Sequence, residues 1–258
     1  MSVGATRCAL VAPVSTGTPF IQPTIAPDRC SYDGRVTTPR VWLFDLDDTL
    51  HDASHASMGH LHVSMGQYIQ DTLGLSKPES DALRRSYWLR YGATLLGLVR
   101  HHGVQPAHFL HHTHLLPGLE QRVRGHAADI VALKRLRGRK YILTNAPAAY
   151  AARVIAVLGI AHCFDGVVTI EDMHMFGDLR PKPDARMLRR LAAQLRVQPS
   201  RCVLVEDTLV HQKAARRVGM GTVWMQGWLP PQARRAPARP QRRPAYVDRR
   251  VTRLRSLV

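Results

Sequence analysis

The stretch VWLFDLDDTL (residues 41–50) decides the fold prediction. It opens with a short apolar run, as do strands that are buried on both faces of a parallel sheet. Three carboxylates, Asp45, Asp47 and Asp48, come at the end of that run. Ligands of open parallel sheets bind at the carboxyl ends of strands. Carboxylates gathered there repel one another and lose solvation, a cost rarely tolerated without a cation. A solvated acidic loop or a helix N-cap is the alternative interpretation of this loop taken alone.

Three later segments place polar residues at comparable positions. Thr144-Asn145 ends the apolar run that begins at Tyr141, Lys182 stands between two prolines, and Glu206-Asp207 follows the apolar run CVLV (202–205). Each segment alone has an ordinary structural explanation: a turn, a surface lysine, or a charge pair at a helix N-terminus. In chain order the set is D-x-D-x-T, T-N, K-P, E-D. This ordered set resembles the four motifs of the haloacid dehalogenase superfamily, over about residues 41–225.

The resemblance implies a role for each motif residue. Asp45 would be a carboxylate nucleophile toward phosphorus, which splits hydrolysis into two easier steps. Asp47 would protonate the leaving oxygen and later activate water. Phosphate would be bound by three residues: Thr144, Asn145 and Lys182. Mg²⁺ would be held by the Asp45 carboxylate, the Asp47 backbone carbonyl and Asp207, with Glu206 acting largely through water.

The aspartate at position 47 favours one reaction type. Dehalogenases of this superfamily lack an aspartate there, whereas phosphatases and phosphomutases need a general acid. The implied activity is therefore a magnesium-dependent phosphatase acting on a small phosphate monoester.

Strand-like runs alternate with helical patterns along the chain, which predicts an α/β fold with a doubly wound parallel sheet. The helical stretch after the first strand is too long for a simple crossover, so we expect an inserted helical cap. Residues 1–40 form a disordered leader, 41–52 and 115–228 the α/β core, 53–114 the cap, and 229–258 an Arg/Pro-rich disordered tail.

The expected cap suggests a substrate. Arg90, Tyr91 and Thr94 fall at spacings that can share one helical face, and the pattern YGxTLxGL (91–98) resembles the pyrimidine 5′-nucleotidase branch of the superfamily. A base could stack on an aromatic ring there. Simple packing of the cap helices is the alternative for each residue, and phosphoglycolate or a sugar phosphate is the alternative substrate. Histidines at 101–102 and 111–114 could bind metal but lack an obvious partner carboxylate.

The composition adds expectations about partners and location. The net charge is +17, and nine arginines with one aspartate give residues 229–258 a charge of +8. This tail raises a rival hypothesis, a nucleic-acid-binding protein that acts through non-specific contacts. No apolar run reaches the roughly 20 residues that span a bilayer. The four cysteines are scattered, so we expect reduced thiols, Cys202 in the core, and a cytoplasmic protein.

Overall fold

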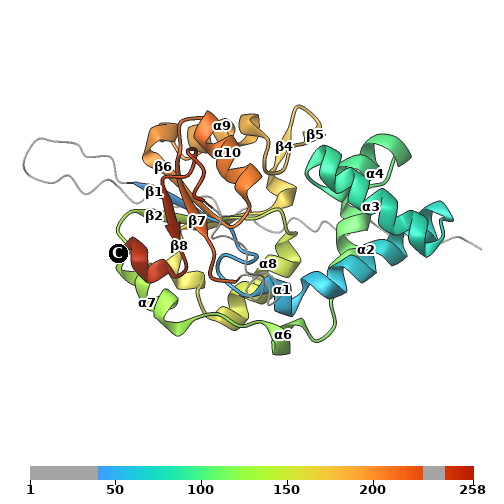
Figure 1. The fold of residues 1–258 in the computed structure, drawn as a ribbon, viewed down its shortest axis with the longest axis horizontal. Coiled ribbons are helices and arrows are strands. Elements are labelled where there is room, and N and C mark those ends of the chain that lie inside the picture. Colours follow the sequence, from blue (N-terminus) through green and yellow to red (C-terminus); the bar gives the residue numbers. More distant parts are fainter. Residues whose placement is uncertain (1–39, 229–241) are drawn as a thin grey trace, which may run out of the picture.

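The computed structural model describes residues 40–228 and 242–258. Within these residues six parallel strands form one sheet, in the order β3-β2-β1-β6-β7-β8. The strands are β1 (Val41–Phe44), β2 (Arg139–Leu143), β3 (Gly166–Val168), β6 (Cys202–Glu206), β7 (Gly221–Met225) and β8 (Arg249–Val251). The chain runs outward from β1 to β3 and then returns to the other side of β1 at β6. The predicted doubly wound α/β fold is confirmed (Figure 1).

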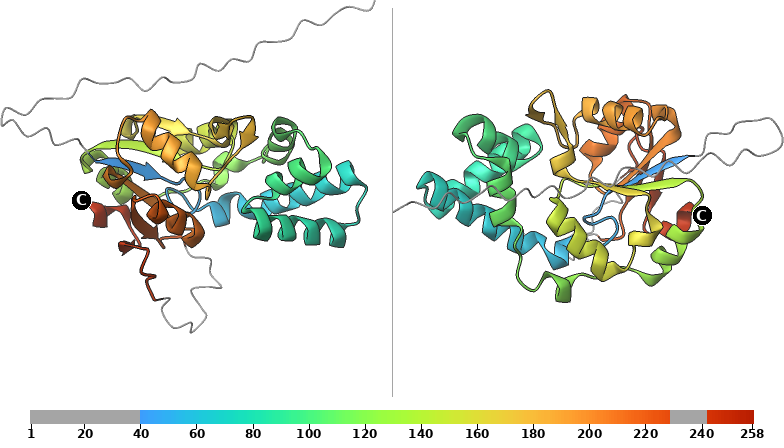
Figure 2. Two further views of the ribbon diagram at one scale, coloured as in Figure 1. Left: turned by 90° about the horizontal axis from the view of Figure 1, so that it is seen from above. Right: turned by 180° about the vertical axis from the view of Figure 1, so that it is seen from behind.

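Helices cover both faces of the sheet (Figure 2). Each face needs a cover because the apolar side chains of β1 alternate between the two faces. Trp42 and Phe44 pack with α7 (Ala127–Arg135) and α8 (Ala148–Leu158). Val41 and Leu43 pack on the opposite face, with α9 (Ala185–Gln194) and α10 (Leu209–Arg217). All four of these β1 side chains are buried. The strand therefore reads as a continuous apolar run because each face has its own core.

A group of helices lies between β1 and β2, as the sequence predicts. They are α1 (Ala53–Ala56), α2 (Met58–Leu73), α3 (Lys77–Tyr91), α4 (Thr94–His102), α5 (Pro106–Thr113) and α6 (Leu119–Arg122). Helices α2 to α5 share a hydrophobic core of their own, which includes Ile69, Leu98 and Phe109. They project to one side of the sheet domain (Figures 1 and 2). Ala56 of α1 instead packs in the core that β1 shares with α7 and α8, so the helices with a separate core begin at α2.

Short elements complete the described chain. Strands β4 (His174–Met175) and β5 (Asp178–Leu179) form a two-stranded antiparallel hairpin. The 3₁₀ turns are η1 (Ala161–Cys163), η2 (Ile170–Asp172), η3 (Pro199–Arg201) and η4 (Leu254–Leu257). Leu179 of the hairpin touches both the core of the sheet and the core of α2 to α5. The hairpin therefore links the two parts.

The expectation of a disordered tail over residues 229–258 is wrong for its second half. Strand β8 pairs in parallel with β7 at the sheet edge, and Val247 and Leu254 are buried. The Leu254 amide donates to the buried Asp129 carboxylate of α7 at 2.8 Å. These partners come from far upstream, which local composition does not reveal. Residues 229–241, and the expected leader apart from Arg40, lie outside the described residues.

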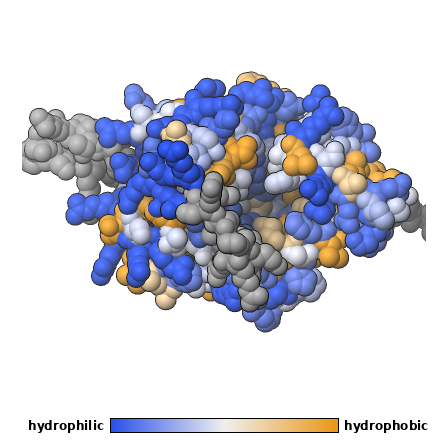
Figure 3. Space-filling view, in the orientation of Figure 1, coloured by the Kyte–Doolittle hydropathy of each residue, from blue (hydrophilic) through white to orange (hydrophobic). Residues whose placement is uncertain are grey.

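Two further expectations concern thiols and the membrane. Cys202 is fully buried in β6, as predicted, and the thiols of Cys163 and Cys202 are both free. Among the described residues no helix is long and apolar enough to cross a bilayer. On the face in Figure 3, hydrophilic residues prevail and hydrophobic ones lie scattered among them.

Candidate active site

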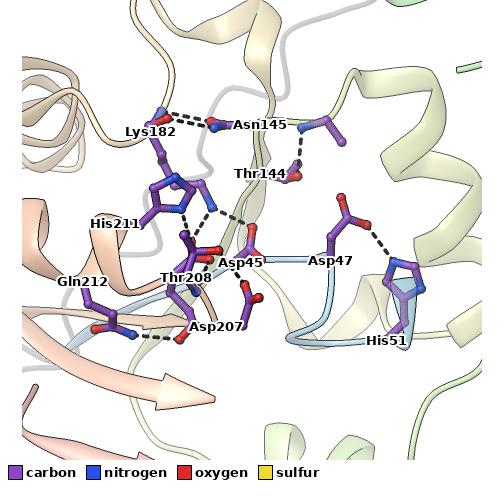
Figure 4. Close-up of polar contacts among 12 residues, drawn as sticks. Asp45, Asp47, His51, Thr144, Asn145, Lys182, Asp207, Thr208, His211 and Gln212 are labelled. Atoms are coloured by element: carbon purple, nitrogen blue, oxygen red, sulfur yellow. Dashed lines mark hydrogen bonds and ion pairs between the residues drawn. The ribbon is translucent and has the colours of Figure 1, made fainter. Parts of the chain in front are cut away.

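The predicted catalytic residues meet at the carboxyl edge of the sheet (Figure 4). Asp45 directly follows β1, Thr144 directly follows β2, and Glu206 ends β6. These three strands are neighbours in the sheet, so their ends bring together residues that lie far apart in the sequence. Asp45, Thr144 and Glu206 are all buried. The motifs, which are far apart in the sequence, thus lie close together in the structure.

Lys182 is the centre of this cluster. Its Nζ donates to Oδ1 of Asp45 at 2.6 Å and to Oε2 of Glu206 at 2.7 Å, and its side chain is 1% exposed. Burial alone would lower the pKa of Lys182, but the two carboxylates hold it above its usual range. The lysine is therefore a buried ammonium that faces the expected nucleophile.

Asn145 fixes the loop that carries Lys182. Its Nδ2 donates to the Lys182 carbonyl and its Oδ1 accepts the Lys182 backbone amide, both at 2.9 Å. Nearby, Thr144 Oγ1 accepts the amide hydrogen of Ala146 at 3.0 Å. The contacts seen for Asn145 are thus structural, and its expected contact with phosphate stays a prediction.

The acidic residues have the arrangement of a cation site. Oxygens of Asp45, Glu206 and Asp207 lie within 4.8 Å of one another. Burial raises the pKa of Asp45 to about 8. The negative charge of Glu206 raises it as well, and the positive charge of Lys182 opposes the shift. Burial together with Glu206 and Asp45 raises the pKa of Asp207 well above its usual range. A cation between these groups would favour their charged forms, and all of the available donors are hard oxygens, which Mg²⁺ prefers. The site therefore fits the implied metal.

Two residues of α10 support Glu206, although no motif in the sequence predicts a role for them. His211 Nδ1 lies 3.0 Å from Oε2 of Glu206, close enough for an ion pair although not aligned for a hydrogen bond. Gln212 is fully buried, and its Nε2 donates to the carbonyls of Glu206 and Val223 at 2.8 and 2.6 Å. Burial would raise the pKa of Glu206, but Lys182 and His211 bring it below its usual range. The only sequence signal for this pair is its place on the helix that follows Asp207.

Asp47 and Asp48 turn away from the cation cluster. Oδ1 of Asp47 accepts from the Tyr150 hydroxyl at 2.7 Å and lies 2.9 Å from His51 Nε2. In Figure 4, Asp47 and Lys182 lie on opposite sides of Asp45. Asp48 accepts the backbone amide and the hydroxyl of Ser54, at 2.8 and 2.6 Å. Asp48 therefore accepts an amide hydrogen from the first turn of α1, whose N-cap is Asp52.

The expected substrate face of Arg90, Tyr91 and Thr94 is wrong in one respect. Tyr91 ends α3 and Thr94 begins α4, so the three residues do not share one helix. Gly92 separates the helices with φ +79°, a left-handed conformation that glycine adopts without strain. Arg90 is exposed beside the Tyr91 ring. Buried Thr94 donates to the Arg84 carbonyl at 3.2 Å.

The α3–α4 turn nevertheless lies close to the catalytic loop. A Cβ on Gly92 would stand 3.1 Å from Cδ of Pro183, the residue after Lys182. Tyr91 precedes this contact, and its hydroxyl lies 2.5 Å from Nε2 of His101. The histidines at 101 and 102 thus bond to tyrosines of α3, since His102 Nε2 lies 2.8 Å from the Tyr87 hydroxyl. The turn is the part of the helical group best placed to meet a substrate.

Solved structures share the fold at low sequence identity. CbbY from Rhodobacter sphaeroides, in complex with phosphate, is 18% identical with a TM-score of 0.57, and the alignment covers 85% of this chain and 96% of that chain. A HAD phosphatase from Thermococcus onnurineus is 20% identical with a TM-score of 0.54, covering 84% and 95%. These similarities agree with the sheet topology and the inserted helices.

Curated relatives are similar over part of their length. "Phosphate metabolism protein 8" of Saccharomyces cerevisiae is 24% identical over 71% of this chain and 60% of its own length. Fructose-1-phosphate phosphatase YqaB of Escherichia coli is 36% identical over 37% of this chain and 48% of its own length. The matches thus span about half to three fifths of these relatives.

The family model matches residues 39–219. This span runs from β1 to the end of α10, and it includes the inserted helices and all three residues of the acidic cluster. The chain belongs to the haloacid dehalogenase-like hydrolases.

Proposed function

We propose that this protein is a magnesium-dependent phosphatase that hydrolyses a small phosphate monoester through an aspartyl-phosphate on Asp45. The observation that carries the proposal is the contact of buried Lys182 with both Asp45 and Glu206 at the carboxyl edge of the sheet. This contact places one positive charge beside the expected nucleophile. A site for a phosphate dianion needs such a charge, because phosphate and carboxylate repel each other.

The first half of the reaction forms the covalent intermediate. A carboxylate oxygen of Asp45 attacks phosphorus, the bond from phosphorus to the leaving oxygen breaks, and Asp47 gives that oxygen a proton. In the second half Asp47 takes a proton from water, whose oxygen attacks phosphorus and releases Asp45 and inorganic phosphate. Lys182 stabilises the charge on the transferring group, with Thr144 and Asn145 as further phosphate contacts.

The metal would be held by Asp45, Asp207 and the backbone carbonyl of Asp47, with Glu206 acting largely through water. When bound it supplies charge neutralisation, which lets the anionic nucleophile and the anionic phosphate approach. The inserted helices, residues 53–114, would act as a cap that excludes water from the reaction.

For the substrate we propose a pyrimidine nucleoside 5′-monophosphate. Support comes from the YGxTLxGL pattern and from its position, because Gly92 of this pattern lies against the loop of Lys182. The second candidate is a sugar phosphate, which the similarity to a fructose-1-phosphate phosphatase favours. We place the activity in the cytoplasm, where free thiols such as those of Cys163 and Cys202 persist.

The test is a substrate screen with and without Mg²⁺, in which Asp45→Asn is the inactive control. We expect release of phosphate by the wild type, loss by roughly 10³-fold or more in Asp45→Asn, and loss on chelation with recovery when Mg²⁺ returns. Asp165→Asn, a change outside the site, should retain activity. Activity in Asp45→Asn, or full activity in chelator, would disprove the mechanism. Better turnover of hexose phosphates or phosphoglycolate than of nucleotides would disprove the substrate assignment alone.

A further inference from the structure

The Asp47 carboxylate is held from one side by two buried side chains. Tyr150, on α8, donates its hydroxyl hydrogen to Oδ1 of Asp47 at 2.7 Å. His51 Nε2 lies 2.9 Å from the same oxygen. The Asp47 side chain is 21% exposed while that of His51 is fully buried. One oxygen of the carboxylate is therefore engaged by the protein.

The hydrogen-bond inventory fixes the direction of each contact. Tyr150 has one hydroxyl hydrogen. Because that hydrogen goes to Asp47, the Tyr150 oxygen can only accept from the Ser57 hydroxyl at 2.8 Å, whose hydrogen also has the Ala53 carbonyl within reach at 3.3 Å. An ionised carboxylate only accepts, so Nε2 of His51 carries the hydrogen in its contact with Asp47. Nδ1 of His51 is buried with no hydrogen-bond partner among the described residues. A lone pair tolerates that environment better than a second N–H group.

The groups that hold Asp47 have little freedom to move. His51, Ser57 and Tyr150 are each at most 2% exposed. They come from separate elements: the loop after β1, the N-cap of α2, and α8. The Tyr150 ring also packs against the His51 and His114 rings, with centroids 6.4 and 5.9 Å apart. The donors thus have fixed positions before any substrate arrives.

We propose that Tyr150 and His51 are positioning residues for Asp47, and this inference rests on the proposed phosphatase function. Two hydrogens converge on Oδ1, so a proton carried by Asp47 resides on Oδ2, the oxygen that neither residue contacts. Oδ2 then gives its proton to the leaving oxygen as the phosphorus–oxygen bond breaks, and takes one back from the attacking water. The pair fixes the side-chain rotamer and thereby the direction of both transfers.

A positioning role can be separated from a merely structural one by the leaving group. 4-Nitrophenolate is a stable anion and needs little help from an acid. Phenolate, which resembles the tyrosine side chain with a pKa near 10, needs more. Misplacing Asp47 should therefore slow the first step much more for phenyl phosphate than for 4-nitrophenyl phosphate. A general loss of structure would slow the reactions of both esters by the same factor.

The experiment compares Tyr150→Phe with the wild type on these two esters in the presence of Mg²⁺. We expect kcat/KM for phenyl phosphate to fall by roughly 10- to 100-fold, and for 4-nitrophenyl phosphate by less than about 3-fold. kcat for 4-nitrophenyl phosphate should still fall, because water attack on the intermediate also uses Asp47. Rapid mixing should then show a burst of 4-nitrophenolate.

Tyr141→Phe is the matched control, because Tyr141 is a buried tyrosine of β2 that packs in the core with Leu188 and Leu191 of α9. Its two kcat/KM values should stay near those of the wild type. If Tyr150→Phe fails to fold, His51→Leu should show the same selective loss, and His51→Gln, which keeps an N–H donor, should recover much of it.

Equal losses on the two esters, or no loss, would overturn the positioning role while leaving the phosphatase intact. A wild type that hydrolyses neither ester, nor any phosphate monoester in the screen, would overturn the proposed function and this inference with it. Selective loss in Tyr150→Phe, with none in Tyr141→Phe, would support the positioning role.

Discussion

At the scale of single residues, the site gathers more negative charge than its own lysine can neutralise. Among the described residues, the carboxylates of Asp45, Glu206 and Asp207 gather within 4.8 Å of one another, and Lys182 supplies its ammonium to the first two. Removing charges from water costs several kcal/mol per ion, and a buried pair regains this only with good geometry. Stability alone does not explain such a cluster. A cation beside a phosphate-binding ammonium would balance this surplus of carboxylates and would lower the raised pKa values of Asp45 and Asp207.

His114 gives a prediction for the pH dependence of stability. Burial lowers its pKa to about 4, only partly opposed by the Leu110 carbonyl and by Asp47. In the unfolded chain the ordinary pKa is near 6.5, so below that pH the unfolded state binds a proton that the folded state refuses. Stability from this group is therefore present above pH 6.5 and is lost as the pH falls toward 4. The loss between pH 7.5 and pH 5 should be about 2 kcal/mol.

His114→Gln removes this titration and should lose about 2 kcal/mol less than the wild type between those two pH values. Urea unfolding at each pH measures the difference. His111→Gln, at an exposed position of the same helix, should leave the pH dependence unchanged. A wild type and a His114→Gln variant with parallel pH profiles would contradict the prediction.

The residues that could be predicted belong to ordered local patterns. Asp45 and Glu206 stand at the ends of neighbouring parallel strands, which the sheet brings together, and Lys182 is marked by the prolines on either side of it. Tyr150 could not be predicted, because it lies 103 residues from Asp47 and meets it only through the packing of α8. His211 and Gln212 likewise acquire their contacts with Glu206 from the position of α10.

At the scale of elements, the glycines of the YGxTLxGL pattern have structural roles. Gly92 ends α3 in a left-handed conformation, and Gly97 lets α4 approach α3 closely. A Cβ on Gly97 would stand 2.1 Å from Cγ of the Tyr87 ring, far inside contact distance. Part of the resemblance to nucleotidases in this region therefore reflects helix packing. Gly97 thus serves the packing of α3 against α4, whereas Gly92 lies against Pro183 beside the catalytic loop.

Gly97→Ala should therefore destabilise the protein even though alanine favours helices. The α3 and α4 helices must separate to admit the methyl group, at a cost of roughly 1–3 kcal/mol that exceeds the gain in propensity. Gly66→Ala is the matched control, because it is also a buried helical glycine but its Cβ would meet nothing closer than 3.6 Å. That change should be neutral or stabilising by up to about 1 kcal/mol. Thermal unfolding of both variants measures the contrast, and equal Tm values would refute it.

At the scale of the whole molecule, alternation of strand and helix was enough to predict the sheet, because β1, β2, β6 and β7 are local apolar runs. The end of the chain was not predictable in this way. Its arginines suggest a disordered basic segment, yet Val247, Val251, Leu254 and Leu257 are all buried. Their partners, the edge of β7 and the end of α7, are supplied only by the finished fold. Residues 242–258 therefore do not form part of the free nucleic-acid-binding tail that the rival hypothesis requires.

The integration of this segment predicts that a chain ending at Tyr246 cannot fold stably. Truncation there removes the four buried apolar side chains, each contributing about 1.5–3 kcal/mol, and exposes the edge of β7. The sum is comparable to the entire stability of a typical domain. We expect aggregation or the absence of a cooperative thermal transition, measured by circular dichroism and size-exclusion chromatography.

Leu254→Ala, a milder form of the same change, should cost about 2–5 kcal/mol. Deleting only Val258, which is 63% exposed, should change stability by less than about 0.5 kcal/mol. A truncated chain that keeps the wild-type Tm would show that β8 adds nothing to the stability of the sheet.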